Sequence, residues 1–312
     1  MKLLLTFSLA LALTTARGAE SAFTNPAEAG PDFADQGEYT GEDCAAQVIA
    51  LGDGKFHVLG YEDGFPGEDK SVKRVEADGH RDGDKIVFEN DGWKGTIAGG
   101  KIDCTNPENT HFKLTKIERK SPTMGATPPP GALVLFDGKN ADEWSGGKLD
   151  QDGNLQCGVK SKKEFGDCTL HIEFRTPFMP AARGQGRGNS GVYLQDRYEV
   201  QVLDSFGLKG ENNECGGIYT KHKPRYNMCF SPLTWQTYDI DFTAARWDGD
   251  GKKLANAKFT VRHNGVLIHE NAEADSATTS AGRKDGPGPG PIQLQNHGTP
   301  VVYRNIWLVE KK

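Results

Sequence analysis

Two segments in the C-terminal half of the chain place side chains capable of acid–base chemistry on one side of an extended backbone. In YEVQVLDS, apolar residues alternate with Glu199 and Gln201, and in PIQLQNHG they alternate with Gln293, Gln295 and His297. Because successive side chains of a strand point to opposite faces, each segment presents its polar members together. Amides, a carboxylate and an imidazole are the groups that bind sugar hydroxyls and move protons. We expect the two segments to lie side by side, although the same alternation also fits a solvated face or one hydrogen-bonded between sheets.

Two further charged residues break this alternation. Asp204 and Arg304 share the parity of the apolar residues in YEVQVLDS and VVYRNIWLV. A buried Arg needs an acceptor, so we predict either a buried Asp204–Arg304 salt bridge or a catalytic role for both residues.

The region from Ala132 to the end is built of short runs with strand periodicity. CTLHIEF and QTYDIDF each place apolar residues on one face, and KFTVRHNGVLIHE contains a strand, an Asn-Gly turn and a second strand. Residues 132–312 are therefore predicted to form an all-β, two-layer sandwich or jelly roll. The glycine-rich stretch RGQGRGNSG, residues 183–191, is predicted to be a flexible loop beside the site.

The preceding part of the chain has a different character. Residues 19–120 contain short alternating runs separated by Asp-Gly and Gly-Gly, which predict a small antiparallel β domain. Residues 121–131 include three successive prolines and are predicted to form a semi-rigid linker.

The N-terminus predicts export. Residues 1–18 combine a basic start, an apolar run of about a dozen residues and small residues before Ala19, which is typical of a secretory signal. The run is shorter than the ~20 residues that span a bilayer, so we expect no membrane span after cleavage and a periplasmic or secreted protein. The net charge of −6 and the lack of a basic run argue against nucleic-acid binding.

Export bears on the six cysteines, which can form disulfides in an oxidising compartment. Nearest neighbours along the chain suggest three candidate pairs, and free buried thiols are the alternative: Cys44–Cys104, Cys157–Cys168 and Cys215–Cys229.

The ordered motifs GNSGVYLQDRYEVQVLDS, ECGGIYTKHKPRYN, WQTYDIDFTAARW, TVRHNGV and GPIQLQNHGTPVVYRNIW resemble those of the 3-keto-disaccharide hydrolase family. The resemblance spans residues 133–309 and implies a concanavalin-like jelly roll. It also implies a hydrolase or lyase acting on 3-keto-glycosides, with an oxidised carbohydrate as substrate. Action after a separate glycoside 3-oxidoreductase is compatible with it. The implied site comprises Glu199, Gln201, Asp204, His297, Arg304 and Asn189, with Gln293 and Gln295 as further binding residues.

Elimination from such a substrate needs a base, an acid and a group that stabilises an enolate. His297 or Glu199 is the candidate base, and His297 is favoured because imidazole titrates near neutral pH. The enolate would be stabilised by Arg304 or by a divalent metal ion held by Glu199, Asp204 and His297.

Two other functions remain as alternatives. An ordinary glycosidase needs carboxyl groups about 5–9.5 Å apart, whereas five residues of strand separate the backbones of Glu199 and Asp204 by roughly 16 Å. A non-catalytic carbohydrate-binding module would use tryptophans as stacking platforms, but Trp235 and Trp307 are expected to pack in the core.

Overall fold

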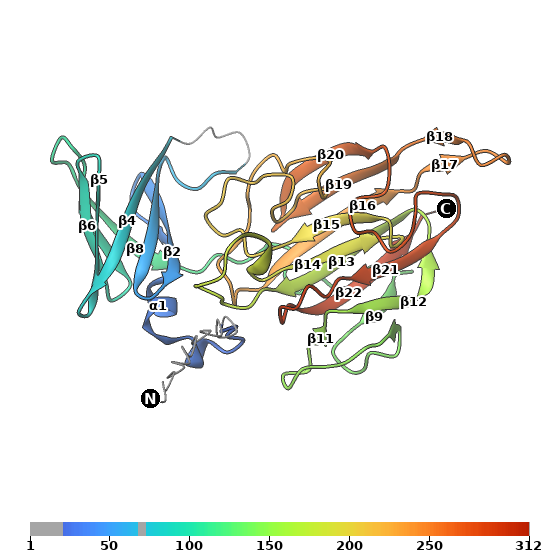
Figure 1. Ribbon diagram of the computed structural model, residues 1–312, viewed down its shortest axis with the longest axis horizontal. Helices are drawn as coiled ribbons and strands as arrows, with labels where there is room; N and C mark the ends of the chain where they lie inside the picture. Colours follow the sequence, from blue (N-terminus) through green and yellow to red (C-terminus); the bar gives the residue numbers. More distant parts are fainter. Residues whose placement is uncertain (1–20, 68–72, 312) are drawn as a thin grey trace, which may run out of the picture.

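A computed structural model describes residues 21–67 and 73–311, and it confirms an all-β fold with antiparallel sheets. Figure 1 shows two units side by side, a small barrel and a larger sandwich. The predicted signal sequence lies outside the described residues. No helix in the described part of the chain has the length and apolar character needed to cross a membrane.

The small unit is a closed antiparallel barrel with strand order β1 to β8, in which β1 pairs with both β2 and β8. Its turns use the expected chemistry, since Asp53-Gly54 and Asp91-Gly92 all have positive φ. A short 3₁₀ turn, η1 (Pro26–Glu28), and α1 (Gly30–Asp35) precede the barrel. The barrel strands are β1 (Gly37–Thr40), β2 (Cys44–Gly52), β3 (Lys55–Glu62), β4 (Arg74–Asp82), β5 (Lys85–Asn90), β6 (Trp93–Ala98), β7 (Lys101–Thr105) and β8 (His111–Ile117).

The larger unit contains two facing sheets, the jelly-roll sandwich that was predicted. The five-stranded sheet has the order β10-β12-β21-β14-β15: β10 (Trp144–Ser145), β12 (Val159–Phe165), β21 (Gly290–Leu294), β14 (Ser190–Leu194) and β15 (Tyr198–Val202). The seven-stranded sheet has the order β11-β22-β13-β16-β19-β20, with β9 beside β22: β11 (Leu155–Gln156), β22 (Val302–Glu310), β13 (Cys168–Arg175), β16 (Gln236–Thr243), β19 (Ala257–His263), β20 (Val266–Ala274) and β9 (Leu133–Phe136). Outside these sheets lie the 3₁₀ turn η2 (Gly184–Gly186) and the hairpin β17 (Arg246–Trp247) and β18 (Lys253–Ala255).

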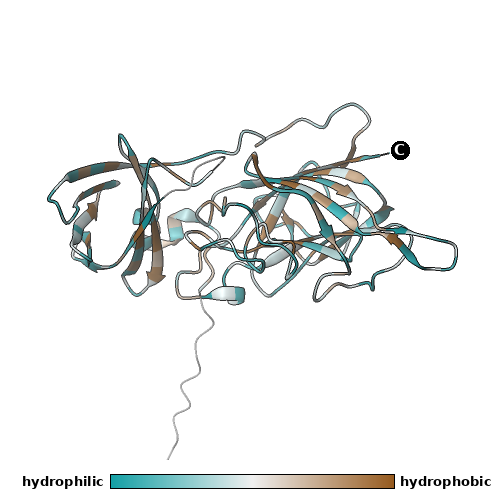
Figure 2. Ribbon diagram, turned by 90° about the horizontal axis from the view of Figure 1, so that it is seen from above, coloured by the Kyte–Doolittle hydropathy of each residue, from teal (hydrophilic) through white to brown (hydrophobic). Residues whose placement is uncertain are grey.

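The sandwich core consists of the residues that the alternation placed on the inner faces. Leu170 and Ile172 of β13 and Ile240 of β16 have no exposed surface, and neither does Val200 of β15. The alternation is visible in Figure 2, where hydrophobic and hydrophilic residues follow one another along the strands. Because the apolar residues of each strand face the core, the residues that alternate with them face outward.

The proline-rich segment, predicted as a semi-rigid linker, is hydrogen-bonded to the sandwich. Thr123 Oγ1 donates to Asp239 Oδ2 at 2.7 Å, and the Gly125 NH donates to Glu173 Oε1 at 2.6 Å. The carbonyl of Ala126 accepts from Trp307 Nε1 at 3.1 Å. The segment is therefore tied along the outer face of the seven-stranded sheet.

The barrel packs directly on one end of the sandwich. Phe206 of the sandwich joins an apolar cluster with Ile49, Leu59 and other barrel residues. The backbone of Phe23, which precedes the barrel, exchanges two hydrogen bonds with Phe178 of the sandwich, at 3.0 and 2.9 Å. The two units therefore share buried apolar contacts.

None of the three predicted disulfides is formed, and all six cysteines are free thiols. Cys44 and Cys104 nevertheless line one cavity, and Cys215 and Cys229 are hydrogen-bonded neighbours. The third pairing, Cys157–Cys168, has no such contact between its members: the Cys157 thiol donates to the Thr299 carbonyl at 3.5 Å.

Candidate functional site

The polar residues of the two predicted segments lie on the outer face of the five-stranded sheet. The segments are not adjacent as expected, because β14 runs between β21 and β15. Tyr193 of β14 is opposite Gln293 on one side and Glu199 on the other. In the next outward-facing row, Gly191 is opposite Gln201. The central strand therefore supplies residues that sequence reasoning did not include in the site.

Glu199 is the central ionisable group of this face. It is only 2% exposed, and its Oε2 accepts a hydrogen bond from the Tyr193 hydroxyl at 2.7 Å. Burial raises the pKa of the Glu199 carboxyl to about 8, although the hydrogen bond from Tyr193 acts in the opposite direction. Gln295 extends the network, since its Nε2 donates to the Tyr193 hydroxyl at 3.2 Å. The carboxyl group is consequently protonated at neutral pH.

Amide groups surround this carboxyl. Gln185 Oε1 accepts from Gln201 Nε2 at 3.1 Å and from Asn189 Nδ2 at 3.0 Å. Within the described residues, three buried amide oxygens on this face have no hydrogen-bond partner: Asn189 Oδ1, Gln201 Oε1 and Gln293 Oε1. Buried acceptors are normally satisfied by protein, water or ligand, so this face is suited to hydroxyl donors.

The backbone of β15 is covered, although β15 is the edge strand of its sheet. Val200 bridges to Ile218, and the Tyr219 NH donates to the Glu199 carbonyl at 3.1 Å. Thr278 Oγ1 accepts from the Glu199 NH at 3.1 Å. The segments that contain Ile218–Tyr219 and Thr278 therefore cover the edge of the strand, which contributes to the burial of Glu199 on an outer face.

His297 lies at the rim of the same face. It follows the end of β21 by three residues and is exposed. Two residues later, the Thr299 hydroxyl donates to the Asn189 carbonyl at 2.8 Å. This hydrogen bond holds the turn that contains His297 against the start of β14. His297 is therefore available to a molecule that enters from solvent.

The predicted Asp204–Arg304 salt bridge is wrong. Asp204 Oδ2 instead accepts from Arg187 Nε at 2.7 Å, and both side chains are almost fully buried. Arg187 also donates to the carbonyl of Ala50 in the barrel, at 3.3 Å. Asp204 is out of phase with the outward-facing residues because it belongs to the contact between barrel and sandwich.

Arg304 lies on the other layer of the sandwich. Its Nε donates to Glu173 Oε2 at 2.7 Å, and its guanidinium lies 4.0 Å from the ring centroid of Trp235. Its neighbour Tyr303 points inward to the Ser190 hydroxyl, so Arg304 points to the outer face of the seven-stranded sheet. This position separates Arg304 from Glu199. Trp235 and Trp307, expected in the core, lie on the same outer face.

The metal-ligand set that was considered is not assembled. Asp204 is engaged by Arg187, and no cluster of three or more His, Cys, Asp or Glu suited to a metal ion occurs in the described part of the chain. We therefore assign no metal ligands.

Sequence reasoning missed Tyr193, Gln185 and Gly191. A signal for two of them was present, because Asn189, Gly191 and Tyr193 alternate along β14 as Glu199 and Gln201 do along β15. Gln185 lies in the loop predicted beside the site and could not be selected by periodicity.

Together, the fold and this face define a jelly-roll sandwich that carries a buried acid among amides on one outer sheet surface. Residues 131–309 match the family model of the 3-keto-alpha-glucoside-1,2-lyase-like domain, which is more than half of the chain. The chain belongs to this family, as its motifs predicted.

A solved structure agrees with this assignment. A candidate glycosyl hydrolase from Parabacteroides distasonis is 35% identical, with 59% of this chain and 85% of that chain covered and a TM-score of 0.55. A second from the same organism is 15% identical, with 58% and 95% covered and a TM-score of 0.43. A search of curated proteins found no match. The family and the first structure support a glycosyl-hydrolase-type function.

Proposed function

We propose that the sandwich domain cleaves glycosides whose sugar carries a ketone at C3. The observation that supports this most directly is a single buried, protonated carboxyl group, Glu199, on a face of amides. A classical pair of glycosidase carboxylates is not available on this strand, because Asp204 is neutralised by Arg187. The family membership points to the same substrate class.

The first half of the reaction is removal of a proton. A ketone at C3 acidifies the C2 hydrogen, and His297 accepts that proton as general base. The negative charge moves to the C3 oxygen. Arg304 lies on the other sheet and is too far away to stabilise this enolate. The amide NH₂ groups of Gln201 and Gln295 are assigned this role instead.

The second half breaks the glycosidic bond. The enolate expels the C1 substituent, and Glu199 donates its proton to the leaving oxygen. Water then adds its oxygen to C1 of the enone and gives a proton to Glu199, and His297 returns its proton to C2. The sum is one water consumed, with one alcohol and one 3-keto sugar released.

The three unpaired amide oxygens of Asn189, Gln201 and Gln293 accept hydroxyl groups of the sugar in this scheme. Substrate and water enter at the His297 rim. We also propose that the protein is exported and acts on sugars already oxidised by a separate 3-oxidoreductase. The chelator arm of the experiment below tests whether a divalent ion takes part.

The experiment is incubation of the mature protein with a 3-keto-disaccharide in deuterated water, with and without chelator. We expect deuterium at C2 and release of the aglycone. His297→Ala should lose C2 exchange, whereas Glu199→Gln should retain exchange and lose cleavage.

The matched control for His297→Ala is His111→Ala, an exposed histidine on the barrel. Cleavage of the unoxidised disaccharide at the same rate, without C2 exchange, would contradict the proposal. Undiminished exchange in His297→Ala would remove His297 as the base while leaving the substrate class intact.

A further inference from the structure

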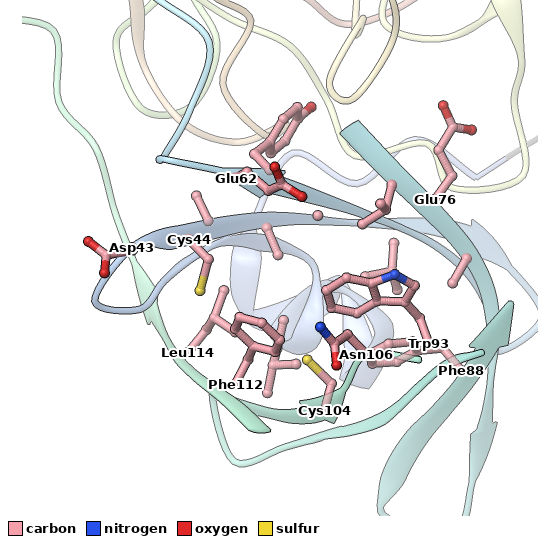
Figure 3. A pocket seen from close by; sticks show the side chains of 18 residues that line it. Asp43, Cys44, Glu62, Glu76, Phe88, Trp93, Cys104, Asn106, Phe112 and Leu114 are labelled. Carbon is pink, nitrogen blue, oxygen red and sulfur yellow. The ribbon is translucent and has the colours of Figure 1, made fainter. Parts of the chain in front are cut away.

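The barrel contains a cavity of its own, separate from the polar face of the sandwich. The cavity has a volume of about 140 Å³, and Figure 3 shows the side chains that line it. Three of them carry aromatic rings that belong to the inner cluster of the barrel: Phe88, Trp93 and Phe112. The rings of Trp93 and Phe112 are 5.4 Å apart between centroids and tilted by 32°. The interior surface is thus largely apolar and aromatic.

The cavity arises from an uneven distribution of side-chain size along the barrel. Fully buried Phe56, Ile86 and Ile97 fill one part of the interior and do not line the cavity. The part of the interior that lines the cavity contains small inward-facing residues, including Ala46 and Ala77. A small eight-stranded barrel is either filled by side chains or holds one small ligand. This barrel is filled in one part and open in the other.

The size and lining restrict the ligand to about one ring. Apolar protein cavities of about 150 Å³ stay dry and bind benzene. Sugars do not fit the apolar wall, because their hydroxyl groups would lose hydrogen bonds to water without replacement. Aromatic side chains favour an aromatic ligand through offset or edge-to-face contacts.

The cavity has few polar groups. Asn106 lies beside the aromatic rings and Glu62 lies at the rim, whereas Asp43 and Glu76 point away from the rings. Asn106 Oδ1 accepts from the Thr110 NH at 2.8 Å, which fixes the orientation of its amide. A hydroxyl on the ligand can hydrogen-bond to Asn106 or Glu62, whereas a carboxylate would lose its hydration in the apolar interior. The charges of the nearby acids are compensated, since Glu62 pairs with Lys73 at 3.0 Å and Glu76 pairs with Arg74 at 2.8 Å.

We propose that the barrel is a binding module for a monocyclic phenol, with the ring in the cavity and the hydroxyl at the rim. The inference does not depend on the proposed function of the sandwich, since no residue of the catalytic face lines the cavity. The ligand is either a free phenol or a single phenolic ring that is attached, at the rim, to a larger molecule.

The first test is calorimetric titration of the reduced full-length protein with p-cresol, benzene, benzoate and glucose. We expect saturable binding of p-cresol, weaker binding of benzene and none of benzoate or glucose. Ala77→Leu, which fills the cavity, should weaken p-cresol binding at least tenfold. Ala98→Leu, on the exposed side of the same barrel, is the matched control and should bind as the wild type does.

A second measurement needs no variant. Cys44 lines the cavity and is half-buried, and Cys157 of the sandwich is half-buried as well. Saturating p-cresol should slow alkylation of Cys44 severalfold and leave Cys157 unchanged, as read by peptide mass spectrometry. No saturable binding to the wild type, binding that survives Ala77→Leu, equal binding of benzoate or unprotected Cys44 would each overturn the proposal.

Discussion

The carboxyl group of Glu199 lies directly over the backbone of Gly191 on the neighbouring strand. A Cβ atom at position 191 would be 2.8 Å from Glu199 Cδ and closer still to its Oε1. Because this glycine lies within a regular strand and has no positive φ, its role is to make room for the carboxyl. The position of the acid is therefore fixed by the absence of a side chain.

Gly191→Ala should displace the Glu199 carboxyl and reduce kcat/KM by about 100-fold, the effect of a misplacement of about 1 Å. Gly186→Ala is the matched control, because a Cβ there meets nothing within 4 Å in the adjacent loop. Steady-state kinetics with a 3-keto-glycoside and circular dichroism distinguish loss of geometry from loss of fold. Equal activity of the two variants would refute the placement of Glu199 as the acid.

The raised pKa of Glu199 makes stability depend on pH. Burial moves this pKa from its ordinary value of 4.5 to about 8. Between these values the folded protein keeps a proton that the unfolded chain has released, so its stability falls as pH rises and levels off above about 8. Glu199→Gln lacks this dependence.

The melting temperature of Glu199→Gln relative to wild type should therefore increase from pH 5 to 8 and then stay constant. The matched control is Glu108→Gln on the exposed surface of the barrel, which should run parallel to the wild type. A constant difference between Glu199→Gln and wild type across this range would contradict the raised pKa.

Asp204 is expected to act in stability and domain contact. Asp204→Ala leaves Arg187 buried without its partner and should lower the free energy of unfolding by about 3–5 kcal/mol. Lys258→Ala, which breaks the half-exposed pair with Glu273, should cost far less because water screens this pair. Urea denaturation of both variants measures the difference, and equal costs would show that the Arg187–Asp204 pair adds nothing.

Arg304→Met tests which face is active. Since Arg304 contacts Glu173 and Trp235 on the other sheet, we expect unchanged kcat/KM. Stability should fall by about 1–3 kcal/mol, because buried Glu173 loses a charged donor. A loss of activity without a loss of stability would place the reaction on the outer face of the seven-stranded sheet.

The fold could be predicted from local patterns, and the site could be predicted in part. Period-two alternation identified the strands, and Asn264-Gly265 forms the expected turn between β19 and β20 with positive φ at both residues. Glu199 and Gln201 do share a polar outer face. These features depend on neighbouring residues, which a sequence displays directly.

Most of the errors concern contacts between distant residues. Alternation gives the face of a residue within its own strand and carries no information on strand order, so the insertion of β14 between β21 and β15 was not visible. The same limit applies to the barrel, whose closure depends on pairing of β1 with β8. The partners of Arg187 and Arg304 are likewise set by packing of separate layers.

The attachment of residues 121–126 to the outer sheet leaves only Glu118–Lys120 between the last barrel strand and the anchored segment. Within these three residues, Arg119 donates to Glu38 of the barrel at 2.7 Å, and its guanidinium lies 4.9 Å from the ring centroid of Phe230 in the sandwich. The three prolines that follow, at 128–130, come after this anchorage and cannot act as a hinge. The two units should therefore tumble in solution as one particle, and glycine substitution at all three prolines should leave the scattering profile unchanged.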